Sequence, residues 1–162
     1  MLKPRNATRL FAVALLTVAG CKPASDKQSD SAFADVQRRG QAVMGVDQYL
    51  SQHVFEDLPD GGRIVLDRGD AADTVAIRTI RAHMRDIAAA FQRGDFTAPG
   101  LVHAQEVPGT RVMKQKRAEI TYTSSQRPTG AEVRILASEP DVVAAIHAFL
   151  QFQRSDHRAA AH

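Results

Sequence analysis

Histidine offers the most chemistry in this sequence, because imidazole binds metals, transfers protons and titrates near neutral pH. The chain contains six histidines, and three of them are followed three residues later by an acid. The six are His53, His83, His103, His147, His157 and His162. The three pairs are His53/Glu56, His83/Asp86 and His103/Glu106. Each pair is a candidate metal or proton-transfer site if its two side chains reach the same space.

The expected secondary structure decides which of these pairs can meet. Residues i and i+3 point to opposite faces of a strand, so His53 and Glu56, in a predicted strand, do not share a site. The same spacing gives neighbours on a helix, so His83 and Asp86 form a plausible local pair. The third pair falls in a predicted loop, where spacing alone decides nothing.

A metal site made of histidines is the most specific hypothesis. His83 and His147 flank the apolar stripes of two predicted helices, and they converge if both helices cover one sheet face. His103 or His157 would then complete the site. Imidazole ligands without thiolate suit Zn²⁺ or Cu²⁺, and methionine sulfur would add affinity for Cu(I). The candidate methionines are Met44, Met84 and Met113. The alternative is that each histidine is a hydrogen-bonded residue at the core boundary, since no HxxxH or HExxH spacing occurs.

The densest basic stretch is RVMKQKR at 111–117, in which Arg111, Lys114 and Arg117 recur every three residues. Such a stretch could contact anionic headgroups or a phosphate-bearing ligand. The alternative is an ordinary solvated face, since no aromatic residue is interleaved with the cations.

Motifs of known enzyme classes do not occur in the sequence. There is no GxSxG, P-loop, Rossmann fingerprint or SxxK. A Ser–His–Asp set assembled by folding stays open, because triads are spatial rather than sequential, but no residue pattern favours one. The sequence therefore favours binding over catalysis.

Residues 1–20 have the pattern of an export signal. A basic start precedes the apolar run LFAVALLTV at 10–18, and small residues follow it. Nine residues are too few for a permanent membrane span, which needs about 20. VAGC at 18–21 resembles the lipobox of bacterial lipoproteins, which implies attachment of diacylglyceryl to Cys21, cleavage before it and acylation of the new amino terminus. The alternative is an ordinary export signal with an incidental cysteine.

The lipobox resemblance changes what the composition means. Cys21 is the only cysteine, so a lipidated chain has no free thiol or disulfide, which excludes thiol catalysis and thiolate metal sites. Lys22 stands where enteric bacteria use aspartate for inner-membrane retention, which implies an outer-membrane lipoprotein in the cell envelope that faces the periplasm. Buried acyl chains would hold it firmly in the bilayer.

The net charge of +3 belongs to the signal rather than to the mature chain. Residues 1–20 contain three of the 21 Lys and Arg residues and none of the 18 acids, so the mature chain is formally neutral. Nucleic-acid partners normally require a basic excess, so we expect none. A protein partner in the envelope stays open.

The mature chain divides into an anchor, a tether and one domain. Residues 21–30 comprise the lipidated cysteine and a polar stretch with Pro and Ser, which we expect to be a flexible tether. Residues 31–157 suffice for one domain with a sizeable core. Residues 158–162 are expected to fray.

Periodicity within the domain predicts two β-hairpins, each followed by a long helix. A short helix at 31–43 is expected first. Two β-rich runs at 47–58 and 63–68 flank PDGG, a hairpin signal. An amphipathic helix is expected at 71–94, ending at Gly94. Its apolar stripe comprises Ile77, Ile80, Met84, Ile87 and Phe91.

The second half repeats this order. One to two helical turns at 108–117 precede strands at 118–125 and 131–138, and Pro140 opens a helix that runs to 157. FQRGD at 91–95 and FQRSD at 152–156 end the two long helices, with Phe91 and Phe152 packed and Arg93 and Arg154 in solvent.

We therefore predict an α+β fold of duplicated ββα units, in which an antiparallel sheet of about four strands carries two long helices on one face. Chance similarity of two helix ends is the alternative to duplication. Phe96 follows the first FQR segment and His157 the second, and we expect any function to lie where the halves diverge.

Three further segments carry a family resemblance: MGVDQ (44–48), VHAQEVPGTRVM (102–113) and AAIHAFLQFQRSDH (144–157). Over 44–157 the chain resembles a group of small uncharacterised bacterial proteins with an MGxDQ start and an AIHxFLxFQxxDH ending, some labelled aspartate carbamoyltransferase. That enzyme is built from a pair of α/β domains with a Ser-Thr-Arg-Thr phosphate loop, whereas this chain has only Gly109-Thr110-Arg111. The group has a His-His pair where Gln52-His53 stands here.

The sequence thus leads to a membrane-anchored envelope lipoprotein acting as a non-enzymatic accessory or ligand-binding module. A histidine-based zinc- or copper-handling protein is the alternative, and an enzyme is the least favoured reading.

Overall fold

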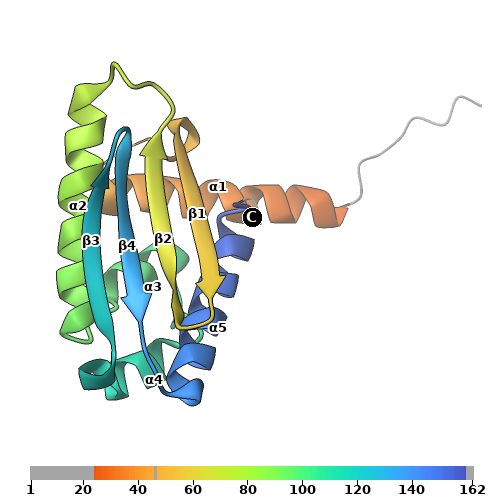
Figure 1. The fold of residues 1–162 in the computed structure, drawn as a ribbon. Helices are drawn as coiled ribbons and strands as arrows, with labels where there is room; N and C mark the ends of the chain where they lie inside the picture. Colours follow the sequence, from red (N-terminus) through yellow and green to blue (C-terminus); the bar gives the residue numbers. More distant parts are fainter. Residues whose placement is uncertain (1–23, 46, 160–162) are drawn as a thin grey trace, which may run out of the picture.

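The computed structural model describes residues 24–45 and 47–159, with side chains from residue 29 onward. The export signal, Cys21 and His162 lie outside these residues. Within the described ranges, no helix combines the length and apolarity that a membrane span requires. Four antiparallel strands form one sheet, and the long helices lie behind it (Figure 1). The predicted α+β fold class is confirmed.

Two hairpins make the sheet, in the strand order β1-β2-β4-β3. The strands are β1 (Ser51–Leu58), β2 (Gly61–Arg68), β3 (Thr121–Arg127) and β4 (Gly130–Leu136). Two-residue turns join each pair, Pro59-Asp60 in the first hairpin and Pro128-Thr129 in the second. Both hairpins lie where residue alternation and turn residues predicted them, with boundaries shifted by a few residues.

The register at the centre of the sheet relates the two hairpins by a local twofold. Ile64 of β2 lies opposite Val133 of β4. A twofold rotation about this pair exchanges β2 with β4 and leaves the pairing of the two strands unchanged. The same offset of 69 residues that takes Ile64 to Val133 also takes the β1–β2 pairing onto the β3–β4 pairing. The sheet is thus built from two equivalent ββ units, as the predicted repeat requires.

The two long helices, α2 (Thr74–Gln92) and α5 (Pro140–Asp156), cover one face of the sheet (Figure 1). Helix α2 packs mainly over β3 and β4, and α5 packs over β1 and β2, so each helix covers the strands of the other unit. Burial of an apolar stripe on each helix drives this packing. The fully buried contributions include Ile80 and Phe91 from α2 and Ile146 and Phe149 from α5.

Local sequence sets the ends of these helices. The Asp73 carboxylate accepts a hydrogen bond from the Ala76 amide at 3.0 Å and caps α2. Gly94, with φ of 78°, follows the end of α2 in a conformation that favours glycine. Pro140 occupies the first turn of α5, as predicted.

Two segments depart from the sequence predictions. Helix α1 (Ala24–Met44) begins inside the segment predicted as a flexible tether and is longer than the helix expected at 31–43. Helix α3 (Thr97–His103) occupies a predicted loop. The two helices stabilise each other, since Arg39 of α1 donates from Nε to the Val102 carbonyl of α3 at 2.6 Å. Tertiary contact therefore supports helices that local periodicity indicates weakly.

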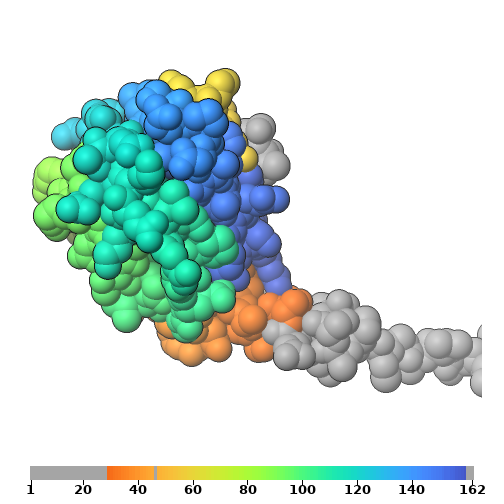
Figure 2. All heavy atoms as spheres, turned by 90° about the horizontal axis from the view of Figure 1, so that it is seen from below, coloured from red at the N-terminus to blue at the C-terminus, as the bar shows by residue number. Residues whose placement is uncertain are grey.

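Helix α1 crosses the helical side of the domain. In Figure 2 its orange residues lie at the side of the molecule away from the yellow β1–β2 hairpin. The remaining elements are short: η1 (Gln48–Leu50), α4 (Thr110–Gln115) and η2 (Arg117–Glu119). Helix α4 lies within the stretch predicted to hold one or two helical turns.

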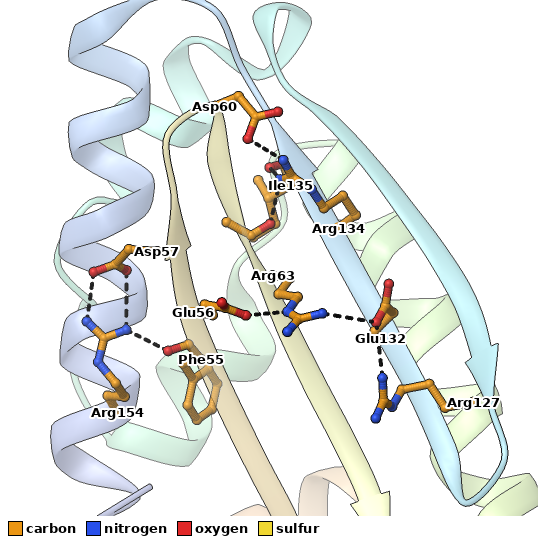
Figure 3. Close-up of polar contacts among 11 residues, drawn as sticks. Phe55, Glu56, Asp57, Asp60, Arg63, Arg127, Glu132, Arg134, Ile135 and Arg154 are labelled. Atoms are coloured by element: carbon orange, nitrogen blue, oxygen red, sulfur yellow. Dashed lines mark hydrogen bonds and ion pairs between the residues drawn. The ribbon is translucent and has the colours of Figure 1, made fainter. Parts of the chain in front are cut away.

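The sheet face away from the helices is polar. Figure 3 shows Arg63 between Glu56 and Glu132, with Arg127 on the far side of Glu132. Glu56 lies on this face while His53, three residues earlier, lies on the helical side, where it lines a pocket. The prediction that His53 and Glu56 do not share a site is confirmed.

The ends of the two FQR segments differ in structure. Arg93 is exposed, as predicted. Arg154 is not simply in solvent, because its guanidinium donates to the Phe55 carbonyl at 2.5 Å and to the Asp57 carboxylate at 2.8 Å (Figure 3). Arg154 therefore holds α5 against the edge strand β1, a role that its helix-end position did not predict.

Candidate functional site

Three histidines from three different elements form a cluster behind the sheet: His53 of β1, His103 at the end of α3, and His157 at the end of α5. The rings of His53 and His157 are stacked, with centroids 5.0 Å apart and planes 15° apart. The His103 ring meets the His157 ring edge-on at 5.1 Å. We call these three residues the histidine cluster.

Aromatic packing fixes the cluster in place. The Phe55 ring stacks on His157 at 5.5 Å, and the Phe152 ring meets His103 edge-on at 5.0 Å. Phe152 is the phenylalanine of the second FQR segment, so the predicted packing role holds, but its partner is an imidazole. Aromatic pairs of this kind each contribute about 0.5–1.5 kcal/mol beyond their burial.

His103 is held at both ring nitrogens. Its Nδ1 contacts a carboxylate oxygen of Asp156, and its Nε2 lies 2.7 Å from Oε1 of Gln153. The side chain is almost fully buried, at 1% exposure. Both partners belong to α5, so His103 ties α3 to the end of that helix. Because each nitrogen already has a partner, His103 has none left to bind a metal or to act as a base.

A pocket of about 70 Å³ adjoins the cluster, between the sheet and the helices, and we call it the cavity. Apolar side chains from the helices and from β1 and β2 make most of its wall, including Val43, Met44, Met84 and Phe149. The polar groups on the wall are four histidine rings and the Gln153 amide. The four rings belong to His53, His83, His103 and His157.

Two ring nitrogens on this wall are buried without a hydrogen-bond partner among the described residues: Nε2 of His53 and Nδ1 of His157. His53 keeps part of its surface exposed, but this nitrogen is not part of it. Leaving a buried polar atom unsatisfied costs about 1–3 kcal/mol. Each such atom in a native fold calls for an explanation, and a ligand or water that hydrogen-bonds there is one.

Burial keeps the imidazoles of His53 and His157 neutral. Desolvation, aided by the nearby His83, lowers the pKa of His53 to about 4. Desolvation lowers the pKa of His157 to about 3, with further contributions from His53 and His103. At neutral pH both rings therefore present one N–H donor and one acceptor nitrogen.

His83 lies on the cavity wall across from the cluster, on α2. Burial lowers its pKa, and the Asp86 charge opposes this shift only in part. Asp86 itself is exposed and lies 3.9 Å from Arg85. The predicted His83/Asp86 pair thus interacts electrostatically. The His83 side chain lines the cavity.

The predicted four-histidine site does not assemble, because His147 lies elsewhere. Its Nε2 is 2.9 Å from both the Leu58 and the Gly61 carbonyls, at the β1–β2 turn. Leu58 is five residues along β1 from His53, about 17 Å in a strand. Helix α5 is rotated so that His147 stabilises the turn while His157 faces the cavity. His83, His103 and His157 do come together near the cavity.

The remaining geometry gives no support for a metal ion. In the part of the chain that the structure describes, no group of three or more His, Cys, Asp or Glu side chains is arranged to hold one. His103 is occupied at both nitrogens, and the lone pairs of the stacked His53 and His157 rings lie in nearly parallel planes. Stacked rings do not direct their lone pairs at one shared ion.

The predicted anion-contact residues are exposed and partly neutralised. Arg111 donates to Glu106 at 3.1 and 3.2 Å, and this pairing raises the Arg111 pKa. Lys114 lines a polar surface hollow with Arg111, Glu106 and Asp95. Arg117 begins the short helix η2 and does not line that hollow. The three cations therefore do not form one positive site.

Sequence reasoning missed His53, Gln153 and Asp156. A signal existed for His53: it stands two residues before Phe55, so both side chains point to the core face of a strand. Gln153 and Asp156 both lie within the second FQR segment, where they were assigned to a helix end. Nothing in the sequence placed them beside His103, which is fifty or more residues away.

Comparison with known proteins adds no assignment. The chain matches no protein-family model, no curated protein and no solved structure. Function must therefore be argued from the site itself.

Proposed function

We propose that this protein is an envelope lipoprotein, anchored through Cys21, whose domain binds a compact and largely apolar ligand with one hydrogen-bonding head group. The observation that carries the proposal is the pair of unpartnered, buried nitrogens, His53 Nε2 and His157 Nδ1, on the wall of an otherwise apolar cavity. The proposed role is binding rather than turnover, since His103 is already engaged at both nitrogens.

The chemistry of the wall selects the ligand class. An apolar lining favours a hydrocarbon body. A neutral imidazole nitrogen is either a donor or an acceptor, and a hydroxyl group both donates and accepts, so a hydroxyl can pair with the free nitrogen of either ring whichever tautomer that ring adopts. An ionised head group is disfavoured, because it would lose its hydration without meeting an opposite charge.

The size of the cavity limits the ligand. Its volume of about 70 Å³ is smaller than the cavity of about 150 Å³ that admits benzene in a well-studied protein core. Met44 and Met84 form part of the wall, and methionine side chains adapt readily to new shapes. The ligand is therefore small, or it enters as these two side chains and α1 adjust.

Phenol and benzene make a matched pair of probes, since they differ by one hydroxyl. Titration into the non-lipidated chain carrying Cys21→Ser, followed by NMR of ¹³C-methyl methionine, should shift the Met44 and Met84 signals. Met113, which is buried away from the cavity, is the internal control. Phenol should bind at least about fivefold more tightly than benzene, the worth of one net hydrogen bond.

His157→Phe separates hydrogen bonding from packing. The phenyl ring keeps the stack with Phe55 and His53 but removes Nδ1. Phenol should lose much of its advantage over benzene in this variant, because only His53 Nε2 remains to pair with the hydroxyl, while benzene binding persists. Equal affinities of phenol and benzene in the unmodified site, or no shift of Met44 and Met84, would refute the binding proposal.

The anchor is tested separately by fractionation. The chain with Cys21 intact should sediment with membranes and partition into detergent, and Cys21→Ser should release it into the soluble periplasmic fraction. Retention of the variant in the membrane fraction would end the lipoprotein part of the proposal without affecting the ligand experiment.

A further inference from the structure

A group of exposed aromatic and aliphatic side chains lies beside the histidine cluster, on the outer surface. Tyr49 and Leu50 of η1 are 68% and 55% exposed. The Tyr49 ring meets Phe33 of α1 edge-on at 6.4 Å, and the Arg158 guanidinium lies 4.5 Å from the Phe33 ring centroid. We call these four residues the aromatic patch.

The aromatic patch lies next to the part of the chain that leads to the proposed anchor. Arg158 donates to the Ser29 carbonyl at 2.9 Å and to the Asp30 carboxylate at 3.1 Å, near the start of α1. Two residues separate Cys21 from Ala24, a reach of at most about 11 Å. Helix α1 rises about 8 Å from Ala24 to Ser29. Ser29 is therefore within about 20 Å of the acylated residue, summing these two limits.

A surface hollow lies between this patch and the cavity. The hollow is lined by Phe33, Tyr49 and Arg158 of the patch and also by His53 and His157 of the histidine cluster. His53 and His157 are also the two residues that the hollow shares with the cavity. The stacked imidazoles therefore form the wall between the hollow and the cavity.

We infer that the aromatic patch rests on the lipid headgroups of the anchoring membrane, so that the hollow opens toward the bilayer and the ligand is a membrane-partitioned amphiphile. This inference rests on the proposed lipid anchor and ligand site. Tyrosine and arginine combine an apolar body with a polar tip and suit the membrane interface. Arg158 is paired with Asp30, so the contact needs no anionic lipid.

The absence of tryptophan from the sequence allows a direct test. Tyr49→Trp places a single fluorophore in the patch. Leu136→Trp is the control, because Leu136 is also exposed but pairs with Gly61 at the opposite end of the sheet from η1. Each lipidated variant is reconstituted into vesicles of phosphatidylcholine brominated near the top of the acyl chains, since bromine quenches tryptophan only at short range.

Tyr49→Trp should lose most of its fluorescence in brominated vesicles, and Leu136→Trp should keep nearly all of it. Addition of phosphatidylglycerol should leave this difference unchanged. Equal quenching of the two variants, or quenching of Leu136→Trp alone, overturns the inference. A failed anchor is recognised beforehand, because the protein then does not co-float with the vesicles. A failed ligand site is recognised from the phenol titration, which uses no membrane.

Discussion

Acid lability is the most direct thermodynamic consequence of the histidine cluster. Burial lowers the pKa of His53 to about 4 and that of His157 to about 3 in the folded chain, against about 6.5 in an unfolded one. At a pH between the folded-state and the unfolded-state pKa values, the two histidines are protonated in the unfolded chain but neutral in the folded chain. Stability is therefore complete above pH 6.5 and falls as the pH is lowered toward 4.

The size of the loss follows from the distance below pH 6.5. At pH 5.5 each neutral buried histidine lowers the free energy of unfolding by about 1.4 kcal/mol relative to pH 8, so the pair contributes about 3 kcal/mol. His83, whose pKa burial also lowers, acts in the same direction. A loss of about 3 kcal/mol is a large part of the 5–15 kcal/mol typical of a domain.

Urea unfolding at pH 8.0, 6.5 and 5.5, followed by circular dichroism, measures this loss. The window ends at pH 5.5 because carboxylates such as Asp73 and Asp95, with lowered pKa values, contribute below it. The double variant His53→Phe/His157→Phe keeps the aromatic stack and removes both titrating groups. Its stability should change by less than half as much as that of the parent over the same window. Parallel pH dependences of parent and variant would refute the assignment.

Two further predictions concern the elements that support the site. Asp156→Asn removes the charge from the contact with His103 and should destabilise the fold by about 1–3 kcal/mol in urea unfolding. The control Asp86→Asn, on the surface, should change the stability by less than about 0.5 kcal/mol. Equal effects of the two substitutions would contradict the role of Asp156. Gly109→Ala places a Cβ 2.1 Å from the Ala145 carbonyl at a φ of 82° and should lower the melting temperature strongly, while Gly100→Ala, with its nearest atom at 3.7 Å, should not.

The fold was largely predictable from local sequence, and the site was not. Alternation with turn residues placed both hairpins, and the 3-4 spacing of apolar residues placed α2, because strand and helix periods are set by backbone geometry. The contact of His103 with Gln153 and Asp156 depends on how α3 docks against α5. Docking of two helices depends on tertiary packing, which a pattern of residue types along one segment does not encode.

Helix α1 was underestimated for a similar reason. Its stretch at 24–30 has the polar composition of a linker, and its apolar face is thin. Val36 is buried, and Arg39 binds the Val102 carbonyl, so the helix is supported by partners distant in sequence. Helical stability that comes from packing rather than propensity leaves little trace in the sequence.

The two FQR segments show how the two halves of the repeat diverge beside the candidate site. Their letters match at an offset of 61 residues, but the buried stripes of the two helices match at 62, since Ile80 corresponds to Val142 and Met84 to Ile146. A shift of one residue turns a helix by 100°. The buried position that Phe91 fills on α2 is therefore filled on α5 by Gln153.

This exchange of a phenyl ring for an amide has a chemical consequence. Phe91 packs against Phe96, Tyr122 and Phe149 and closes its half of the core. Gln153 is equally buried but polar, so it needs a hydrogen-bond partner, which His103 supplies. The sheet diverges at the same place, because the offset of 69 residues that relates the hairpins takes His53 to Tyr122 and Phe55 to Ser124. The histidine cluster thus lies where the two ββα units differ most, and His157, the residue that distinguishes the second FQR segment from the first, is part of it.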